Sequence, residues 1–440
     1  MLESDDSSEL HVRVVVVGAG PAGLAAATAA SAAGLDVLLL DAAPAPGGQI
    51  WRARQGVAAA PVARALARLA PAGVRLMAGT RVVMALPDRA LLIDGPDGAR
   101  RLRWDRLVLA TGARERLLPF PGWTLPGVFG AGGLQALVKG GWPIRGRRVV
   151  VAGTGPLLLA AAATLRREGA LVVGLVEEAR APALARFAGT LAAHPRKALQ
   201  ALRLGTALLG VPFMAGTRVV AAEGSGRVER VLLEGPGGRQ RTIACDALAA
   251  GWGLIPQTGL AQSLGCALAP RFGAPAIEVD ASQRTSVAGV FAIGECTGVA
   301  GAASAQLQGE AAGRAVASEL GVASRQPPER AARLAREHVF AAAVASAFPA
   351  PAGWAARLRD DTLVCRCEDV AWSALREQPD LRSAKLATRC GMGHCQGRLC
   401  HDALSAVMHW PRLPVRSPLG PAPLGALLAT LDNPQDPSST

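Results

Sequence analysis

The chain has 440 residues, about three times the size of a common domain, so we expect two or three hydrophobic cores. Its formal net charge of +13 comes almost entirely from arginine, because lysine occurs only at Lys139, Lys197 and Lys385. The basic residues are spread along the chain and form no cluster interleaved with aromatic residues. We therefore expect no binding of nucleic acid.

The start of the chain, MLESDDSSEL, is acidic and lacks the positive region of a signal peptide, so a cytoplasmic protein is predicted. Residues 14–35 carry no charge and are long enough to cross a bilayer, but glycines interrupt them. The pattern instead predicts a buried strand at Val14–Val17, a turn, and a small-residue helix at Leu24–Ala33. No transmembrane segment is expected.

A glycine-rich turn follows this first strand, in the stretch VVVVGAGPAGLAAA. In a dinucleotide-binding turn, Gly18 permits the bend, Gly20 lets a pyrophosphate approach the backbone, and Gly23 lets the helix pack on the strand. Asp41 ends the next strand, where a carboxylate accepts hydrogen bonds from an adenosine ribose. The turn therefore predicts a bound adenine dinucleotide, at the helix N-terminus that favours phosphate. Its predicted binding residues are Gly18, Gly20, Pro21, Ala22, Gly23 and Asp41.

An internal repeat sets the predicted architecture. The segment MAGTRVV at residues 77–83 returns unchanged at 214–220, 137 residues later. Within two residues of the same offset, three further landmarks recur in the same order: GAGPAG as GTGPLL, Asp41 as Glu177, and LATG as LAAG. Four landmarks in one order indicate a duplicated unit, and each copy has the pattern of a Rossmann-type domain.

The second copy departs from the glycine pattern. Gly153 and Gly155 are present, but Leu158 stands where the third glycine belongs, and its branched side chain would push the helix from the strand or fill the cofactor groove. Glu177 could still meet an adenosine ribose, so this copy is either a nucleotide site or a structural relic. The acid disfavours a 2′-phosphate, so NADP is the least favoured guest.

After the second copy, residues 289–293 predict one more strand, followed by a glycine turn and a long helix. This segment is too short for a domain, and its simplest placement is in the sheet of the first domain, so the second domain is inserted in the first. The predicted fold class is α/β, with two Rossmann-type domains and a small helical C-terminal domain. The predicted boundaries are 10–142 with 272–322 for the first domain, 143–271 for the second, 323–360 for a helical linker, 361–410 for the C-terminal domain and 411–440 for a proline-rich tail.

Five of the eight cysteines are crowded between residues 365 and 400, which indicates a metal site rather than a disulfide framework. Cys365 and Cys367 can hold one iron from a turn, while Cys395 and Cys400 can hold a second from a loop that opens onto a helix. Four thiolates suit a [2Fe–2S] cluster or zinc. The C-x-C spacing favours the cluster, because zinc sites more often use hooks with C-x₂₋₄-C spacing.

The other three cysteines, Cys245, Cys266 and Cys296, are isolated in sequence and are predicted to be small buried residues. The chain also lacks the CxxC redox pair of a disulfide reductase. No nucleophile and base stand in a convincing arrangement, so no catalytic residue is assigned.

The N-terminal 320 residues resemble the two-dinucleotide-binding-domain flavoproteins of the glutathione and thioredoxin reductase type. The segments PGGQ after Asp41, ATG before residue 113, and a late Gly-Glu pair carry this resemblance. It implies FAD in the first domain, with ATG near the flavin and the late pair at the ribityl chain, where Glu295 replaces the usual aspartate. The further cofactor-binding residues implied are Gly48, Gln49, Ala110, Thr111, Gly112, Gly294 and Glu295.

Residues 361–405 resemble the bacterioferritin-associated ferredoxin-like [2Fe–2S] domain, whose pattern includes CRCE and GMGxCQGxxC. The resemblance implies that the iron ligands are Cys365, Cys367, Cys395 and Cys400. It leaves Cys390 spare, and a ligand role for Cys390 or His394 would contradict it.

The whole chain resembles the larger component of heteromeric flavin-dependent amino-acid and opine dehydrogenases. This group includes the larger (A) component of opine oxidase, the B component of hydrogen cyanide synthase and the alpha component of proline or hydroxyproline dehydrogenases. The phrases ARERLLPFPGW, GWGLIPQT and QRTSVAGVFAIGE fit it. The resemblance implies a subunit that receives electrons from a smaller FAD-containing partner, which oxidises a C–N bond. It would pass them through flavin and [2Fe–2S] to a quinone or another carrier, which would bring the complex to the inner membrane face.

Two alternatives stay open at this point. The first is a self-sufficient NADH-dependent reductase, which Leu158 disfavours; the second is a redox sensor or scaffold that keeps a nucleotide for structure alone. The first site is also open to a non-redox adenine nucleotide, with FMN at a subunit interface, as in the related alpha components of sarcosine oxidases.

Overall fold

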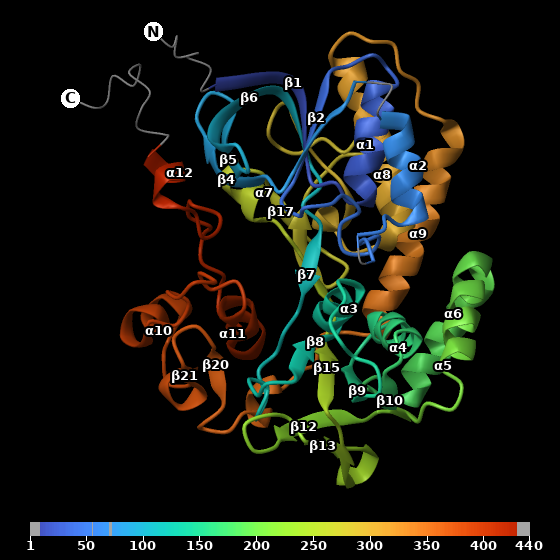
Figure 1. The fold of residues 1–440 in the computed structure, drawn as a ribbon, viewed down its shortest axis with the longest axis vertical. Coiled ribbons are helices and arrows are strands. Elements are labelled where there is room, and N and C mark those ends of the chain that lie inside the picture. Colours follow the sequence, from blue (N-terminus) through green and yellow to red (C-terminus); the bar gives the residue numbers. More distant parts are fainter. Residues whose placement is uncertain (1–8, 55, 70–72, 429–440) are drawn as a thin grey trace. The chain divides into compact units, whose positions relative to one another are not determined.

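The computed structural model describes residues 9–54, 56–69 and 73–428. The acidic start of the chain and the end of the predicted proline-rich tail lie outside the described residues. The chain divides into two compact units, drawn in Figure 1. Unit 1 comprises Met1–Ala113, Pro256–His338 and Pro414–Thr440, and unit 2 comprises Arg114–Ile255 and Val339–Leu413. In the described ranges, no helix is both long enough and apolar enough to cross a membrane.

Unit 1 is built on a seven-stranded sheet in the order β3-β2-β1-β6-β5-β4, with β19 paired to β6. Strands β3, β2, β1, β6 and β19 run parallel to their neighbours, whereas β4 and β5 form an antiparallel extension. The order of the parallel strands is that of the Rossmann-type sheet that the glycine turn predicts. The strands are β1 (Glu9–Val17), β2 (Val37–Asp41), β3 (Arg75–Ala78), β4 (Arg81–Leu86), β5 (Ala90–Gly95), β6 (Gly98–Leu109) and β19 (Val290–Ala292).

The two faces of this sheet bury separate cores. Val14 and Val16 of β1 lie in a core with the helices, whereas Val15 between them lies in a core on the other face, because successive residues of a strand point to opposite sides. Figure 1 shows the helices that cover the first face lying together. They are α1 (Pro21–Ser31), α2 (Ala60–Leu69) and α8 (Gly301–Glu319).

Helix α8 packs directly on α1 through two glycines. A Cβ on Gly309 would lie 2.3 Å from the carbonyl oxygen of Ala22, and one on Gly313 would lie 2.5 Å from that of Ala26. This close approach, together with the pairing of β19 with β6, confirms that the segment after the second domain returns to the first sheet.

Unit 2 contains a five-stranded parallel sheet in the order β11-β10-β9-β15-β8, and a three-stranded antiparallel sheet. The parallel strands are β8 (Val128–Gly130), β9 (Arg148–Gly153), β10 (Leu171–Glu177), β11 (Phe213–Ala215) and β15 (Ala247–Gly251). The antiparallel strands are β12 (Arg218–Glu223), β13 (Arg230–Glu234) and β14 (Gln240–Ala244). The helices are α3 (Ala131–Lys139), α4 (Leu157–Arg167), α5 (Ala181–Thr190) and α6 (Pro195–Ala207).

The repeated segment MAGTRVV occupies equivalent places in the two units. In unit 1, the backbone N–H of Thr80 donates to the carbonyl oxygen of Asp41 at 2.9 Å. In unit 2, that of Thr217 donates to the carbonyl oxygen of Glu177 at 3.1 Å. The two copies therefore share a turn as well as a sequence, and the predicted fold of two Rossmann-type domains, one inserted in the other, is confirmed.

The C-terminal cysteine region shares a core with the second dinucleotide-binding sheet, within unit 2. The indole Nε1 of Trp354 donates to the carbonyl oxygen of Pro119 at 2.6 Å, and the Trp354 ring packs edge-on against Trp252 at 5.0 Å. The helices and strands of the cysteine region are β20 (Leu363–Cys365), β21 (Val370–Ala371), α10 (Leu381–Thr388) and α11 (Cys400–Met408).

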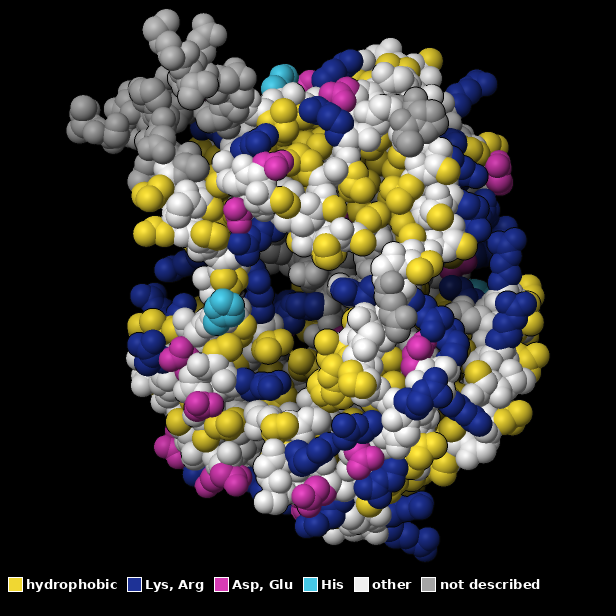
Figure 2. Space-filling view, in the orientation of Figure 1, with side chains coloured by type: hydrophobic (Ala, Val, Ile, Leu, Met, Phe, Trp, Pro, Cys, Tyr) yellow, Lys and Arg dark blue, Asp and Glu magenta, His cyan; other side chains and the backbone are white. Residues whose placement is uncertain are grey.

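The predicted domain limits remain predictions. The compact unit that contains the second sheet begins at Arg114 rather than near residue 143, because β8 pairs with β15. The remaining elements are β7 (Ala113–Glu115), β16 (Leu254–Pro256), β17 (Leu268–Arg271), β18 (Ala274–Ile277), α7 (Gly259–Ser263), α9 (Pro328–Ala347) and α12 (Leu424–Leu428). Figure 2 shows Lys and Arg side chains distributed over the visible face of both units, mixed with acidic and apolar side chains.

Candidate functional site

The first glycine turn has the geometry that its sequence predicts. Gly18 has a φ of 109°, and a Cβ there would lie 2.3 Å from the carbonyl oxygen of Ala110. A Cβ on Gly23 would lie 1.8 Å from the carbonyl oxygen of Gly18, so α1 packs against the turn. Helix α1 begins at Pro21, after a cap at Gly20 that makes no side-chain hydrogen bond. The N-terminus of α1 therefore keeps backbone donors for a phosphate.

Other predicted residues gather around this helix start. A Cβ on Gly48 would lie 3.1 Å from the Cα of Gly20, and a Cβ on Gly294 would lie 2.8 Å from the Cβ of Ala22. The structure thus brings the PGGQ loop and the late Gly-Glu pair to the glycine turn, although each is distant in sequence. The approach of glycines from three segments forms a cradle that a side chain would fill, and this fits an extended dinucleotide.

Asp41 lies at the end of β2 with its carboxylate beside the turn. It accepts hydrogen bonds from the backbone N–H of Ala19 at 2.6 Å and from that of Ala43 at 2.7 Å. Each carboxylate oxygen has a second lone pair, so the group can also accept from ribose hydroxyls. These contacts place Asp41 where the sequence predicts a ribose-binding acid.

Thr111 and Glu295 make contacts that the sequence does not indicate. The Thr111 hydroxyl donates to the carbonyl oxygen of Gln257 at 2.7 Å. The Glu295 carboxylate accepts the N–H of Gly301, at the start of α8, at 3.1 Å, and burial raises its pKa. Glu295 thus caps α8, and its contact with a ribityl chain remains a prediction.

Gln308 is a residue of this region that sequence reasoning missed. Its buried Oε1 accepts the N–H of Gly294 at 2.5 Å and the hydroxyl of Thr297 at 3.2 Å, which fixes the glycine turn from α8. Cys296 is fully buried, and its Sγ donates to the carbonyl oxygen of Ile293 at 3.1 Å. Cys296 is therefore a packed structural thiol, as its isolation predicts.

The second glycine turn differs from the first in the side chains that lie against it. Its acid, Glu177, is buried, and it accepts the Thr154 hydroxyl at 2.6 Å, the Gly155 N–H at 2.9 Å and the Ala179 N–H at 2.8 Å. Burial raises the pKa of Glu177. The hydrogen bonds of the Glu177 carboxylate thus go to groups of its own loop. Its burial leaves little access for the hydroxyls of a ribose.

A later segment of the chain lies beside the second glycine turn. The Cβ of Phe348, just beyond α9, lies 3.9 Å from where a Cβ on Gly155 would be. The Phe348 ring packs edge-on against Phe187 of α5 at 5.2 Å. Leu158 is buried in the core of this domain, as its apolar side chain requires. The start of α3, a further anion-binding position, is occupied by Glu115, which accepts the N–H of Gly132 at 2.6 Å and that of Gly133 at 2.8 Å.

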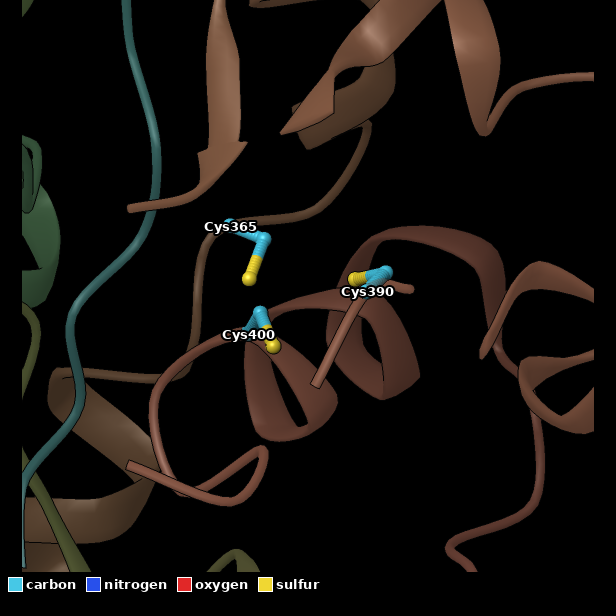
Figure 3. A group of neighbouring side chains, drawn as sticks. All are labelled: Cys365, Cys390 and Cys400. Atoms are coloured by element: carbon cyan, nitrogen blue, oxygen red, sulfur yellow. The ribbon is translucent and has the colours of Figure 1, made fainter. Parts of the chain in front are cut away.

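The cysteine region brings together three buried thiols. The Sγ atoms of Cys365, Cys390 and Cys400 all lie within 4.8 Å of one another, and Figure 3 shows them pointing toward a common space. Two sulfurs bound to one tetrahedral metal lie about 3.8 Å apart, so this spacing fits a metal–thiolate centre. Cys365 and Cys400 are predicted ligands, whereas Cys390 was predicted to be spare.

The two other predicted ligands contact each other. The Cys367 side chain hydrogen-bonds both the backbone and the thiol of Cys395. Cys367 is exposed and Cys395 is half-buried. The predicted set of Cys365, Cys367, Cys395 and Cys400 thus lies in one region. However, Cys365 lies near Cys400 and Cys367 contacts Cys395, whereas the sequence interpretation paired Cys365 with Cys367 and Cys395 with Cys400.

Arginine side chains surround this region. Arg114 and Arg412 both pair with Asp402, which lies two residues after Cys400; the contact of Arg412 is 2.9 Å. Burial and the positive charges of Arg412 and Arg398 lower the pKa of Arg114 to about 10. Such unbalanced positive charge favours an anionic neighbour, and a cluster held by thiolates is anionic.

The duplicated Rossmann-type fold with its intact first glycine turn defines a two-dinucleotide-binding-domain flavoprotein. Residues 12–316 match the family Pyridine nucleotide-disulphide oxidoreductase, and the chain belongs to this family. It is 34% identical over 457 residues to the A component of opine oxidase from Rhizobium meliloti (strain 1021), across 93% of this chain and 97% of that protein. It is 33% identical to hydrogen cyanide synthase subunit HcnB of Pseudomonas aeruginosa, across 89% and 91% of the two chains.

Solved structures agree on the fold. L-proline dehydrogenase from P. horikoshii superposes with a TM-score of 0.69 at 21% identity, covering 95% of this chain and 80% of that one. Thioredoxin reductase from T. acidophilum superposes with a TM-score of 0.54 at 25% identity, covering 70% and 99%. The chain is therefore an oxidoreductase of the flavoprotein type, and the predicted resemblance to the larger component of opine oxidase and its relatives is confirmed.

Proposed function

We propose that this chain is the electron-transferring subunit of a heteromeric flavin-dependent dehydrogenase that oxidises the C–N bond of an amino acid, an opine or a related secondary amine. The observation that carries the proposal is the contrast between the two glycine turns. The acid of the first turn, Asp41, is partly exposed, whereas the acid of the second, Glu177, is buried and accepts three hydrogen bonds from its own loop. Phe348 also lies beside Gly155 in the second turn. Electrons would therefore not enter from a nicotinamide nucleotide.

The relatives support the donor side of this proposal. The opine oxidase component and hydrogen cyanide synthase subunit HcnB are each named as one part of an enzyme with several subunits. By analogy, a smaller FAD-containing partner would oxidise the amine, and the present chain would accept its electrons. The complex would work in the cytoplasm, with a quinone or another carrier as the acceptor.

In the first domain, the cofactor proposed is FAD. The N-terminus of α1 would bind its pyrophosphate, Asp41 its adenosine ribose, and the Gly48 and Gly294 segments would flank its extended chain. Flavin supplies the exchange between two-electron and one-electron steps. An adenine nucleotide in this cradle, with FMN at a subunit interface, would use the same residues for its phosphates and ribose.

In the cysteine region, the cofactor proposed is a [2Fe–2S] cluster with the ligands Cys365, Cys367, Cys395 and Cys400. The soft thiolates suit iron, and the arginines near Asp402 would offset the negative charge of the cluster. A one-electron centre that works together with a two-electron flavin lets a dehydrogenase deliver electrons singly to its acceptor.

Co-expression with a smaller flavoprotein from the same source, followed by co-purification and cofactor analysis, tests the proposal. We expect one complex that contains flavin, iron and labile sulfide, and that is reduced by a secondary amine but not by NADH. Prompt bleaching of the isolated chain by NADH would instead support a stand-alone reductase. A chain that contains flavin but neither partner nor iron would contradict the electron-transfer role.

A further inference from the structure

The five C-terminal cysteines form an inner and an outer group. The inner group is Cys365, Cys390 and Cys400, all buried, with sulfurs within 4.8 Å of one another. The outer group is the contacting pair Cys367 and Cys395, which solvent reaches. The C-x-C motif is therefore divided between the groups, because the chain leaves β20 at Cys365 and turns before Cys367.

This grouping changes which thiols share an iron. The sequence interpretation gave one iron to Cys365 with Cys367 and the other to Cys395 with Cys400. The structure instead places Cys400 beside Cys365, and Cys395 beside Cys367. Each iron of the proposed cluster would then take one ligand from the C-x-C turn and one from the following loop, with one iron buried and the other toward solvent.

Cys390 lies at the buried end of this arrangement. It follows Arg389, which ends α10 in the left-handed conformation, and its N–H donates to the Thr388 hydroxyl at 3.2 Å. Arg389 in turn donates to the carboxylate of Glu368 at 2.8 Å, which ties the loop to the C-x-C turn. The Cys390 side chain is fully buried, and its Sγ lies within 4.8 Å of the Sγ atoms of Cys365 and Cys400.

The loop after Cys390 has a second anchor. The imidazole of His401, next to Cys400, fills the space beside two glycines: a Cβ on Gly391 would lie 2.0 Å from its Nε2, and one on Gly397 would lie 2.4 Å from its Cε1. The direction of the Cys390 side chain is thus fixed from both ends of its segment. A buried cysteine usually packs as a small apolar group, but this one points at two other sulfurs (Figure 3).

We infer that Cys390 is a fifth, non-ligating thiol that donates its S–H to the ligand sulfur of Cys400 and so raises the reduction potential of the buried iron. The inference rests on the proposed [2Fe–2S] cluster. Its physical basis is that a reduced cluster carries more negative charge on its sulfurs, so a hydrogen bond to them stabilises the reduced form. Cys390 is therefore a positioning residue, because it acts through the sulfur of Cys400. Its hydrogen bond favours reduction of the buried iron.

The test compares Cys390→Ala, Cys390→Ser and wild type in the purified complex. Iron and labile sulfide report whether the cluster is retained, and a redox titration followed by electron paramagnetic resonance gives its midpoint potential. We expect full cluster content in both variants, a lower midpoint potential in Cys390→Ala, and recovery of most of that shift in Cys390→Ser, whose hydroxyl can donate. Cys245→Ala, a buried thiol elsewhere in unit 2, is the matched control and should leave the potential unchanged.

The failures of this test are distinguishable. An unchanged midpoint potential in Cys390→Ala would overturn the inference and leave the proposed cluster intact. Loss of iron in both Cys390 variants, with iron retained in Cys367→Ser, would show that Cys390 is itself a ligand. A wild-type complex without iron and sulfide would overturn the proposed cluster and the inference with it.

Discussion

Phe348 lies against Gly155, with its Cβ 3.9 Å from the position that a Cβ on that glycine would take. Gly155 is the second glycine of the turn, where a dinucleotide needs the backbone free for its pyrophosphate. A segment beyond α9 thus contacts the glycine turn of the second Rossmann-type domain.

Replacement of Phe348 tests how much this contact contributes to the fold. The ring is half-buried and packs on Phe187 at 5.2 Å, so Phe348→Ala should lower the free energy of unfolding by about 2 kcal/mol. Chemical denaturation measures this change. The control is Leu202→Ala on α6, where the side chain is 63% exposed, and it should change stability by less than about 0.5 kcal/mol. Equal effects of the two substitutions would show that Phe348 does not pack as described.

The variant Glu177→Gln tests the hydrogen bonds that the buried Glu177 carboxylate accepts from its own loop. The amide can replace one carboxylate oxygen, but its NH₂ would face the N–H of Gly155, so the variant should lose about 1–2 kcal/mol of stability at pH 7. A flavin-loaded protein with unchanged stability would contradict this account of the second turn.

The pH dependence of this difference has a definite sign. Because burial raises the folded-state pKa of Glu177, the native state binds more protons than the unfolded chain between the unfolded pKa, about 4.3, and the raised folded value. In that window the wild type gains stability as the pH falls, and the glutamine variant lacks this gain. The stability difference between them should therefore grow from pH 7 toward pH 4 in parallel denaturation curves.

Asp41→Ala should weaken the binding of the cofactor in the first domain. The substitution removes an ionised acceptor for the ribose and the partner of the Ala19 N–H, which we expect to raise the Kd for FAD by about 10- to 100-fold. The ratio of flavin absorbance to protein after gel filtration measures the loss. Asp36→Ala, whose ion pair with Arg75 is about half exposed, is the control and should retain flavin.

Trp354→Ala should destabilise the cysteine region and the second sheet together. The indole is 2% exposed and packs on Trp252, so its removal should cost about 3–5 kcal/mol. Tryptophan fluorescence and the visible absorbance of the cluster should then change in one transition, at a lower denaturant concentration than in wild type. Leu386→Ala, at a side chain that is 73% exposed, should leave the transition in place.

Local sequence patterns predicted much of the fold, including the geometry of the first glycine turn. The glycines, Asp41 and the repeated MAGTRVV segment encode turns whose geometry depends on a few neighbouring residues, and they lie as expected. The return of the segment after residue 272 to the first sheet also followed from simple connectivity.

The parts that sequence did not predict depend on contacts between distant segments. Phe348 reaches Gly155 from a far later part of the chain, and no local pattern marks that meeting. Gln308 bonds Gly294 from the middle of an otherwise ordinary helix. The grouping of the thiols depends on the turn after β20, which sends Cys365 inward and Cys367 outward although only one residue separates them.

The common core of unit 2 also limits how this protein can be engineered. The cysteine segment cannot be separated cleanly from the rest of unit 2, because Val364, Trp372 and Leu375 pack in the same cluster as Phe120 and Trp252. A fragment cut near residue 361 would leave that apolar surface in water and would be prone to aggregation. A useful transplant would have to carry both segments of unit 2, Arg114–Ile255 and Val339–Leu413, rather than the cysteine segment alone.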